Sequence, residues 1–507
     1  MSVRVQSITE TGAGGILIDV ECHVSNGLPN IIIVGFANKA VDEAKERLRS
    51  AYSSSKLDMP RKRITINLAP ADLPKDGTSY DLAMATAILA ASGQVKLPKQ
   101  PTAIFIGELG LDGDVRPVRG IIGKLLAGRK AGQEVFYIPE KNLAQAMLVP
   151  DITLVPVKTL RDLYLDLTDS LRLKRLSTQD FSPTTTPKGQ ESNFRHIIGQ
   201  KRAKRALEIA AAGGHNILMS GPPGTGKSML AKATPSILPP LHREETLEVT
   251  HLHSLASRHY DQIITDRPFR SPHHSASETS ILGGGTNPRP GEISLSHLGV
   301  LFFDELPEYS RSTLEALRQP LEDRVITVAR AKDSVTFPAN FMLIATCNPC
   351  PCGFYGTSKA CSCLPQQIVN YQRKLSGPIL DRIDLYVEVD EVKHRDLLGN
   401  ADEEPSEQVR MRVYEARQRQ QKRYQDNLKA NATLTNEDIK RHAKLTPEAT
   451  SLLNQAGEKL GISARAYMRT IKVARTIADL EGAEQIDSAH IGEALQYRRQ
   501  SGTQAIL

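Results

Sequence analysis

The segment at residues 221–228, GPPGTGKS, constrains the fold more than any other part of this 507-residue sequence. It satisfies the pattern G-x-x-x-x-G-K-S/T, in which a glycine-rich loop between a strand and a helix binds phosphate. Residues 216–219 (NILM) predict a short buried strand before the loop, and residues 229–233 predict the first turn of a helix after it. Such a helix start aims backbone N–H groups and its positive dipole end at phosphate oxygens. A flexible glycine turn is the alternative, and the two flanking elements favour the phosphate site.

A pair of acids completes the predicted nucleotide site. Lys227 would contact the β and γ phosphates of ATP, and Ser228 would hold Mg²⁺. The metal also needs a carboxylate from a neighbouring strand, and residues 299–306 (GVLFFDEL) predict a buried strand that ends in two acids. Because adjacent buried carboxylates are costly without a cation, we expect Asp304 to bind Mg²⁺ and Glu305 to polarise the attacking water. An acidic turn after a core strand is the alternative. The other loop residues predicted to line the nucleotide are Gly221, Pro222, Pro223, Gly224, Thr225 and Gly226.

The sequence pattern divides the chain into four regions. Residues 1–175 alternate short β-rich runs with helix-length amphipathic stretches, which predicts one α/β domain. Residues 176–193 are rich in Ser, Thr, Pro and Gln and predict a linker. Residues 194–390 contain the P-loop and continue the α/β pattern, whereas residues 391–507 lack strand signals and predict a helical domain. The predicted strands of the first region are ILIDV, NIIIV, RITINL, AIFIGEL, EVFYIP and ITLVPV, and its predicted helices span residues 38–55 and 79–91.

Composition limits the partners and the compartment. No apolar stretch approaches the roughly 18 residues that a membrane span requires, and the N-terminus shows no secretory apolar core. We therefore expect a cytoplasmic protein without a membrane contact. The net charge of +7 permits a polyanionic partner. With no tryptophan and 5% aromatic residues, base stacking is not expected to be the main way of holding a nucleic acid.

Five of the six cysteines fall within residues 347–363, CNPCPCGFYGTSKACSC. In a reducing compartment such a cluster is typical of a metal site or of redox chemistry rather than of disulfides. Cys347 ends a predicted strand and is expected to lie where it cannot share a metal. The other four form two C-x-C pairs, and four thiolates suit a tetrahedral Zn²⁺ that would hold the loop closed. An iron–sulfur cluster and free thiols are the alternatives. The predicted zinc ligands are Cys350, Cys352, Cys361 and Cys363.

The order of polar markers after the P-loop resembles that of the AAA+ ATPases. The markers lie in residues 341–348 (FMLIATCN), 377–384 (GPILDRID) and 463–465 (SAR). The resemblance implies that Asn348 is the sensor-1 residue that orients the lytic water, and that Arg465 is sensor 2. It also implies that Arg382 is an arginine finger for a neighbouring subunit's ATP, which requires a ring, in this class a homo-hexamer. Taken singly, both arginines could be ordinary surface residues.

Two insertions sharpen the class. The P-loop serine and the first acid lie 76 residues apart, more than one helix and one strand need. The excess includes residues 267–299, which resemble the helix-2 insertion of the AAA+ branch with magnesium-chelatase motor subunits and MCM-type helicases. Residues 325–338 (VITVARAKDSVTFP) predict two β runs around a basic turn and resemble the pre-sensor-1 hairpin of that branch. The resemblance implies that Arg330 and Lys332 contact the DNA backbone, and a plain surface hairpin is the alternative.

The chain as a whole resembles the YifB/ComM family of magnesium-chelatase-like proteins. The stretches that carry the resemblance lie at residues 197–228, 268–277, 291–308 and 463–482. It implies an N-terminal Lon protease/ribosomal-S5-like α/β domain, an AAA+ α/β core with the insertion and hairpin, and a C-terminal helical lid. It further implies an ATP- and Mg²⁺-dependent hexameric helicase on single-stranded and branched DNA, acting by branch migration in homologous recombination during natural transformation. A chelatase-type remodeller is the alternative, although a chelatase motor subunit usually begins at its ATPase module.

A third function, ATP-dependent proteolysis, would depend on residues 74–79 (PKDGTS). This stretch and the apolar helix after it resemble the Lon protease around its nucleophile, and Ser79 takes the place of the catalytic serine. Such a serine needs a lysine to take its proton. Alignment on residues 124–127 puts Ile122 at the lysine's position and leaves Lys124 two residues out of register. Because an aliphatic side chain cannot act as a base, we expect this domain to serve binding or assembly.

Overall fold

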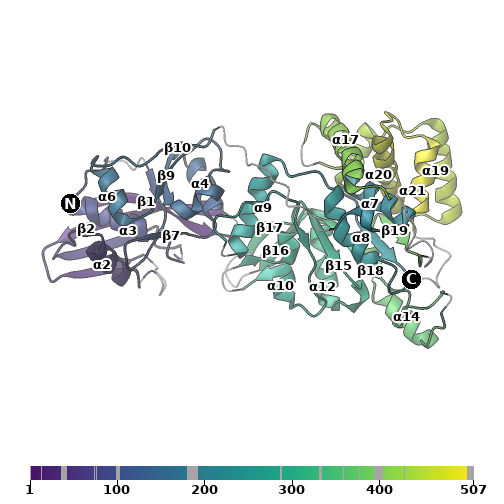
Figure 1. The fold of residues 1–507 in the computed structure, drawn as a ribbon, viewed down its shortest axis with the longest axis horizontal. Coiled ribbons are helices and arrows are strands. Elements are labelled where there is room, and N and C mark those ends of the chain that lie inside the picture. The colour runs from purple at the N-terminus through teal and green to yellow at the C-terminus, as the bar shows by residue number, and fades with distance from the viewer. Residues whose placement is uncertain are drawn as a thin grey trace. The chain divides into compact units, whose positions relative to one another are not determined.

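The computed structural model describes most of residues 2–498, and their contacts divide the chain into two compact units (Figure 1). The first comprises Met1–Thr185 and Leu241–Thr265, and the second comprises Thr186–Pro240 and Asp266–Leu507. The P-loop therefore belongs to the second unit. The residues outside the described set are 1, 13, 36–40, 42, 74, 76, 99–102, 180–191, 258, 286–287, 330–333, 358, 376, 393–402, 427–428 and 499–507.

An eight-stranded mixed sheet forms the centre of the first unit, in the order β10-β9-β8-β5-β1-β2-β4-β3. β1 and β2 pair antiparallel along their full length. On β2, Ile18, Val20 and Cys22 are buried at every second position, as the two-residue period of a strand requires. The strands are β1 Ser2–Thr11, β2 Gly14–Ser25, β3 Asn30–Val34, β4 Arg63–Ala69, β5 Ala103–Phe105, β8 Val135–Pro139, β9 Thr153–Val157 and β10 Leu176–Ser177, with β6 Glu108–Leu109 and β7 Val115–Arg116 as a separate ribbon.

Helices cover both faces of this sheet. Val5 and Ile8 on β1 belong to two different hydrophobic clusters, because residues three apart on a strand point to opposite faces. One cluster contains the apolar helix α3 (Asp81–Ala91) and the other contains the buried side of α4 (Ile121–Lys130). The remaining helices are α2 Ala44–Ser54, α5 Leu143–Ala146 and α6 Leu160–Leu167.

The six predicted strand runs and the helix predicted over residues 79–91 are confirmed. Of the helix predicted over residues 38–55, Ala44–Ser54 is helical, and residues 38–40 and 42 lie outside the described residues. All six predicted runs form strands, but AIFIGEL is divided between β5 and β6, which lie in different sheets. β1 was not predicted. β10 extends the sheet through Ser177, two residues into the segment predicted as a linker, and the Thr178 hydroxyl there donates to the Ile152 carbonyl at 3.1 Å. Residues 180–191 of the predicted linker lie outside the described residues.

The first unit also contains a segment from the middle of the chain. Residues 241–265 fall within the predicted range 194–390, yet they fold with the N-terminal residues. Their helix α9 (Arg243–Ala256) and the stretch after it place Leu247 and Ile263 against the cluster of α4. Gln145 fixes the same segment by donating from Nε2 to the carbonyls of His259 and Gln262, both at 3.1 Å.

A five-stranded parallel sheet forms the centre of the second unit, in the order β12-β15-β18-β11-β19. Its strands β15, β18 and β19 are labelled in Figure 1. Its central strands are apolar runs with every residue of β15 and β18 buried. Because all five strands are parallel, their carboxyl ends meet at one edge. The strands are β11 Ile217–Ser220, β12 Phe269–Arg270, β15 Val300–Phe303, β18 Met342–Cys347 and β19 Leu385–Glu388, and the short hairpins are β13 Gly283–Gly284 with β14 Arg289–Pro290 and β16 Val325–Ala329 with β17 Ser334–Pro338.

Helices surround this sheet and build the C-terminal part of the unit. Those near the sheet are α7 Lys201–Gly213, α8 Lys227–Ala233, α10 Glu278–Leu282, α11 Glu292–Leu295, α12 Arg311–Ala316, α13 Arg318–Asp323, α14 Pro365–Arg373 and α15 Gly377–Leu380. The C-terminal helices are α17 Ser406–Tyr424, α18 Asn436–His442, α19 Pro447–Leu460, α20 Ala464–Glu481 and α21 Ser488–Gln496. The described helices include none with the length and apolarity needed to cross a membrane.

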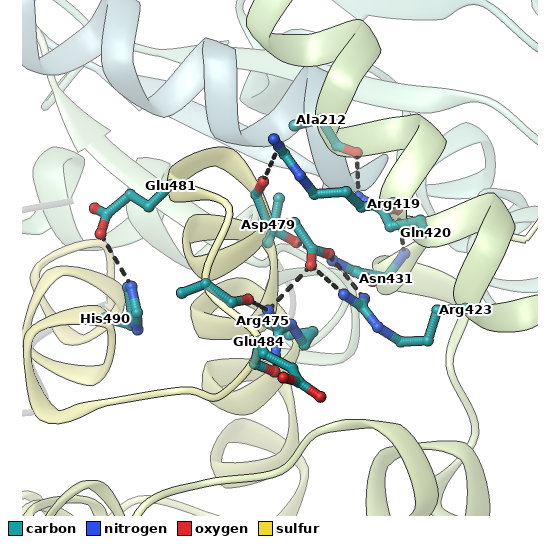
Figure 2. Close-up of polar contacts among 12 residues, drawn as sticks. Ala212, Arg419, Gln420, Arg423, Asn431, Arg475, Asp479, Glu481, Glu484 and His490 are labelled. Carbon is teal, nitrogen blue, oxygen red and sulfur yellow. Dashed lines mark hydrogen bonds and ion pairs between the residues drawn. The ribbon is translucent and has the colours of Figure 1, made fainter.

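A buried charge cluster ties the C-terminal helices together (Figure 2). Asp479 on α20 lies between Arg423 of α17, at 2.5 Å, and Arg475, at 3.1 Å. Asn431 donates to the same carboxylate at 2.9 Å, and Arg475 also donates to the carbonyls of residues 483 and 484. Both terminal nitrogens of Arg475 and the Asp479 carboxylate have partners within the unit, and Arg475 Nε is left without a hydrogen-bond acceptor among the described residues. Contacts of this kind are typical of a structural network.

Candidate functional site

The P-loop lies between β11 and α8, where the sequence predicted it. Gly224 and Gly226 have φ values of 82° and 87°, a left-handed conformation that favours glycine. Lys227 begins α8, and its Nζ donates to the carbonyls of Gly221 at 2.6 Å and Pro222 at 2.8 Å. Burial lowers the pKa of Lys227. The lysine ammonium is thus held over the loop that a phosphate would occupy.

The two acids diverge at the end of β15. Asp304 Oδ2 accepts a hydrogen bond from Ser228 Oγ at 2.9 Å, and Asp304 Oδ1 accepts one from Thr346 Oγ1 at 2.6 Å. Because both contacts are hydroxyls, the charge of this half-buried carboxylate is left for a cation. The serine and aspartate oxygens fit Mg²⁺, which binds through one or two carboxylates and retained waters. Glu305 is exposed and points elsewhere, toward Asn348, whose Nδ2 lies 3.4 Å from Glu305 Oε1.

Asn348 links the lysine to the second acid. Its Oδ1 accepts from Lys227 Nζ at 3.2 Å, while its Nδ2 faces Glu305. The strand β18 that carries Asn348 lies between the P-loop strand and the acid-bearing strand. The prediction that the acids sit on a strand neighbouring the P-loop strand is therefore wrong, because β18 intervenes. The structure brings together Lys227, Ser228, Asp304, Glu305 and Asn348.

Two residues of the site were missed by sequence reasoning. Thr346 donates to Asp304 and accepts from the backbone N–H of Glu305 at 2.9 Å. The signal was a hydroxyl within the apolar run FMLIATCN. Gln200, just before α7, donates from Nε2 to the carbonyls of Thr225 at 3.3 Å and Asp390 at 2.7 Å, and so supports the loop from outside. Gln200 lies within residues 197–228, which carry the family resemblance, but nothing in that stretch indicated a contact with the P-loop.

The two predicted arginines lie apart from these residues. Arg382 follows α15, where it forms an ion pair with Glu322 and donates to the Pro378 carbonyl at 2.6 Å. Arg465 is exposed in the first turn of α20, one turn before Arg469, which donates to the Ile383 carbonyl at 2.9 Å. No contact between either arginine and the P-loop is present among the described residues. An arginine that serves a neighbouring subunit would have no such contact within one chain.

β16 and β17 form the predicted hairpin, but the predicted DNA-contacting residues Arg330 and Lys332 lie outside the described residues.

The residues considered for proteolysis are Ser79 and Lys124. Ser79 is buried, with 7% of its surface exposed. Lys124 donates to Glu10 at 3.1 Å and to the Arg119 carbonyl at 2.9 Å, and these contacts give it a structural partner of its own.

The predicted zinc ligands come together. Ligand atoms of Cys350, Cys352, Cys361 and Cys363 all lie within 4.8 Å of one another. Cys347 is buried at the end of β18 and is not part of this group. A hydrogen bond from the backbone N–H of Phe354 lowers the pKa of Cys352 to about 5. None of the six cysteines, all of which lie in the described part of the chain, forms a disulfide.

Comparisons with known proteins place the chain in a family. Family models match three parts of it: "Magnesium chelatase, subunit ChlI" at residues 193–397, "Subunit ChlI of Mg-chelatase" at residues 20–142, and "Magnesium chelatase, subunit ChlI C-terminal" at residues 403–498. The "Competence protein ComM" of Haemophilus influenzae is 44% identical over 507 residues, which cover 97% of this chain and 97% of that protein. The chain belongs to the YifB/ComM family of magnesium-chelatase-like proteins.

Other relatives extend this result. The "Uncharacterized protein YifB" of Salmonella typhimurium is 44% identical over 485 residues, which cover 95% of this chain and 94% of the relative. A "Lon protease" of Dictyoglomus thermophilum is 32% identical over 149 residues, only 28% of this chain and 18% of that protein. Membership of the YifB/ComM family makes the P-loop unit an AAA+ domain with a helical C-terminal region, and the N-terminus is similar to Lon. It also implies ATP and Mg²⁺ and an ATP-driven remodelling activity.

Proposed function

We propose that this YifB/ComM protein is a cytoplasmic, ATP-driven DNA motor that works as a homo-hexamer. Its substrates would be single-stranded and branched DNA, unwound or branch-migrated in homologous recombination during natural transformation. The observation that supports this most is the convergence of Lys227, Ser228, Asp304, Glu305 and Asn348 at one edge of the parallel sheet. The similarity to a competence protein over 97% of the chain supports DNA as the substrate.

Each residue of this site has a role in the proposal. Bound MgATP supplies the phosphoanhydride bond that is cleaved. Lys227 would bind its β and γ phosphates, and Ser228 and Asp304 would hold the metal. Glu305 would take a proton from the attacking water, and Asn348, which contacts both Lys227 and Glu305, would fix the position of that water.

In this proposal, four basic residues outside the site contact a neighbouring subunit's nucleotide, sense the nucleotide or bind DNA. Arg382 would leave Glu322 to reach the ATP of a neighbouring subunit, and Arg465 would sense the same nucleotide from the helical lid. Arg330 and Lys332 would contact the DNA backbone from the tip of the β16–β17 hairpin. The N-terminal domain would serve binding or assembly. The proposal includes one Zn²⁺ at Cys350, Cys352, Cys361 and Cys363, in addition to Mg²⁺.

The test compares the wild-type protein with Lys227→Ala on forked and four-way DNA. Wild type should hydrolyse ATP faster when DNA is present and should unwind or migrate the branch. Lys227→Ala should bind DNA but lose both activities, because the ammonium that contacts the phosphates is gone. Lys232→Ala is the matched control, since Lys232 is an exposed lysine on the same helix and should leave both activities intact. ATPase activity without DNA stimulation, together with no unwinding by wild type, would contradict the proposal.

Assays on the same purified protein distinguish two other functions from the proposed DNA motor. The family models named for magnesium chelatase favour a chelatase-type remodeller as the second candidate. That function predicts ATP hydrolysis stimulated by chelatase partner subunits and not by DNA. ATP-dependent proteolysis predicts cleavage of casein that Ser79→Ala abolishes; the engagement of Lys124 by Glu10 and Arg119 argues against it.

A further inference from the structure

The four clustered cysteines belong to a loop that no helix or strand stabilises. We define the cysteine loop as residues 350–363; its described part contains turns and bends but no regular element. It begins three residues after the end of β18 and leads into α14. Such a loop must be held by its side chains. Cys350 at its start is fully buried, and the other three cysteines are half-buried.

The sulfur atoms are arranged as they would be around one ion. The Sγ atom of Cys352 lies 3.3 Å from that of Cys350 and 3.5 Å from that of Cys361, and the Sγ atoms of Cys350 and Cys361 are 3.7 Å apart. The sulfur of Cys363 completes the group. Four sulfurs at Zn–S bonds of about 2.3 Å form a tetrahedron whose edges are about 3.8 Å. A disulfide would require about 2.05 Å. An iron–sulfur cluster places several irons between its cysteines and needs them farther apart.

Backbone N–H groups point at these sulfurs. The N–H of Cys352 donates to Cys363 Sγ at 3.4 Å, and that of Tyr355 donates to Cys350 Sγ at 3.3 Å. Hydrogen bonds to sulfur are typical of metal-bound thiolates, because they disperse negative charge that four ligands bring to one ion. The two donors also fix the backbone on either side of Gly353. The set thus provides four ligands and part of the shell around them.

The cysteine loop touches the P-loop directly. Gly353 has φ 85°, and a Cβ placed on it would lie 2.4 Å from Cδ and 2.7 Å from Cγ of Pro223. The glycine therefore packs against the proline ring with no room for a side chain. At the other end of the contact, the Gly221 N–H donates to the carbonyl of Cys347, three residues before the first ligand. The P-loop is supported by residues on both sides of Cys350.

We propose that Cys350, Cys352, Cys361 and Cys363 bind one Zn²⁺ whose occupancy sets nucleotide affinity, because the bound ion holds Gly353 against Pro223. The inference rests on the proposed nucleotide site and adds a regulatory metal to it. Loss of the ion frees the cysteine loop and removes the support of the P-loop. Nucleotide binding then weakens although every residue that contacts nucleotide is unchanged.

The first experiment tests the metal site without nucleotide. Wild-type protein should contain one zinc per chain, and Co²⁺ substitution should give the intense thiolate charge-transfer absorption of tetrahedral cobalt. Cys361→Ser should lower zinc retention by about tenfold or more. Cys361→His, which keeps a zinc ligand at that position, should restore it, and Cys22→Ala should not change it. Zinc absent from wild type, iron in its place, or zinc unaffected by Cys361→Ser would overturn the metal site.

The second experiment tests the link to the P-loop. Affinity for a fluorescent ADP analogue with Mg²⁺ is measured before chelation, after chelation, and after Zn²⁺ is returned, with circular dichroism as the check on folding. Removal should weaken binding by about tenfold, the scale of a sub-ångström displacement at a binding site, and return of Zn²⁺ should restore it. Equal affinity with and without the metal would overturn the link.

Substitutions at two glycines of the cysteine loop test the contact between Gly353 and Pro223. Gly353→Ala would make its methyl group clash with the Pro223 ring, and it should weaken nucleotide binding while zinc content is kept. Gly356→Ala is the matched control: it has φ 75° in the same loop, so backbone strain is alike, but its Cβ meets nothing within 4 Å. Equal effects of the two variants would overturn the link. Failure of the nucleotide site itself has a different signature, in which zinc-loaded wild type does not bind the analogue at all.

Discussion

At the scale of single residues, the site depends on the turn of the chain at Glu305. This residue has φ 53°, a left-handed conformation that costs about 1–3 kcal/mol for a non-glycine residue and persists only where the surroundings fix it. Here its N–H donates to the hydroxyl of Thr346, and its carboxylate faces Asn348. The turn separates two consecutive acids, so Asp304 faces Ser228 while Glu305 is free for a different task.

Glu305→Gln tests that division of tasks. The amide keeps the size of the side chain and can still contact Asn348, but it cannot take a proton. We expect MgATP affinity close to that of wild type and ATP turnover lower by about 100-fold or more, the usual contribution of a positioned base. Equilibrium binding of an ATP analogue and steady-state phosphate release measure the two quantities.

The matched control is Glu308→Gln. This half-exposed acid lies three residues further on, where its carboxylate is 3.6 Å from Lys374, and its loss should leave turnover unchanged. Turnover by Glu305→Gln at the wild-type rate would show that another group is the base.

The sequence predicted the residues of the site that belong to a contiguous motif and missed those that depend on register. Lys227, Ser228 and the two acids follow from GPPGTGKS and GVLFFDEL alone. The role of Thr346 depends on β18 pairing with β15 so that Phe303 lies opposite Ala345, which no local pattern specifies. Long-range register is set by packing, and a hydroxyl in an apolar run carries no sign of its partner.

At the scale of elements, buried polar groups join the C-terminal helices to the parallel sheet. His215, just before β11, contacts Asp384 at 3.2 Å through Nδ1 and Thr476 of α20 at 2.8 Å through Nε2. Asn431 donates to the Thr476 hydroxyl at 3.0 Å and to the Asp479 carboxylate at 2.9 Å. Figure 2 shows Asn431 beside the cluster of Asp479 with Arg423 and Arg475. A continuous hydrogen-bonded path therefore runs from His215, just before the P-loop strand, into the C-terminal helices.

Asp479→Ala tests the cluster. Arg475 is fully buried, so removal of the Asp479 carboxylate leaves the arginine charge uncompensated. The substitution should therefore lower the free energy of unfolding by about 3–5 kcal/mol. Denaturant unfolding followed by circular dichroism measures the change. Glu415→Ala, which removes an exposed partner of Arg419 on α17, is the control and should cost about 0.5 kcal/mol or less. Equal effects would mean that the buried cluster does not stabilise the helices.

An ion pair and capping contacts at the N-terminus of α18 make the free energy of unfolding depend on pH. The ion pair with Lys429 and the capping contacts of Thr435 lower the pKa of Asp438 to about 2. Because the folded pKa is below the unfolded value of about 4, this contribution is present above pH 4 and is lost as the pH falls through 2. The stability difference between wild type and Asp438→Asn should therefore shrink from pH 5 to pH 2, as measured by unfolding at each pH. A difference independent of pH would refute the assignment.

Elements were predicted well where apolar runs are long and poorly where they are short. The strands β15 and β18 are continuous apolar runs and were predicted. β12 has two residues, Phe269 and Arg270, inside the stretch predicted as an insertion, yet it forms the outer strand of the sheet. Two residues are too few to show a period, so their pairing with β15 could not be read from the sequence.

At the scale of the whole molecule, the chain crosses between its two units three times. The crossings follow residues 185, 240 and 265. The sequence pattern divides the chain at residues 175 and 390, whereas the contacts of the folded chain group residues 241–265 with the N-terminal residues. The periodicity of residues 241–265 indicates a helix and says nothing about which core receives its apolar face, because Leu247 and Ile263 would suit either.

Truncation tests this division. A chain that starts at residue 186 keeps residues 241–265 without the core that covers Leu247 and Ile263, and it should aggregate. A second chain in which a Gly/Ser linker also replaces residues 241–265 should stay monodisperse and bind nucleotide. Light scattering and size-exclusion chromatography measure the difference. If both chains behave alike, the segment is not part of the N-terminal core.

The third crossing has a consequence for how such proteins evolve. A domain attached by one linker can be exchanged by a single genetic crossover in that linker, and each parent's core arrives complete. Here a crossover between residues 185 and 241 would combine one parent's N-terminal sheet with the other parent's α9, and the apolar contact of α4 with Leu247 and Ile263 would join two lineages. The N-terminal domain and this internal segment are therefore expected to be inherited as a pair, and chimaeras of family members should fold only when both pieces come from the same parent.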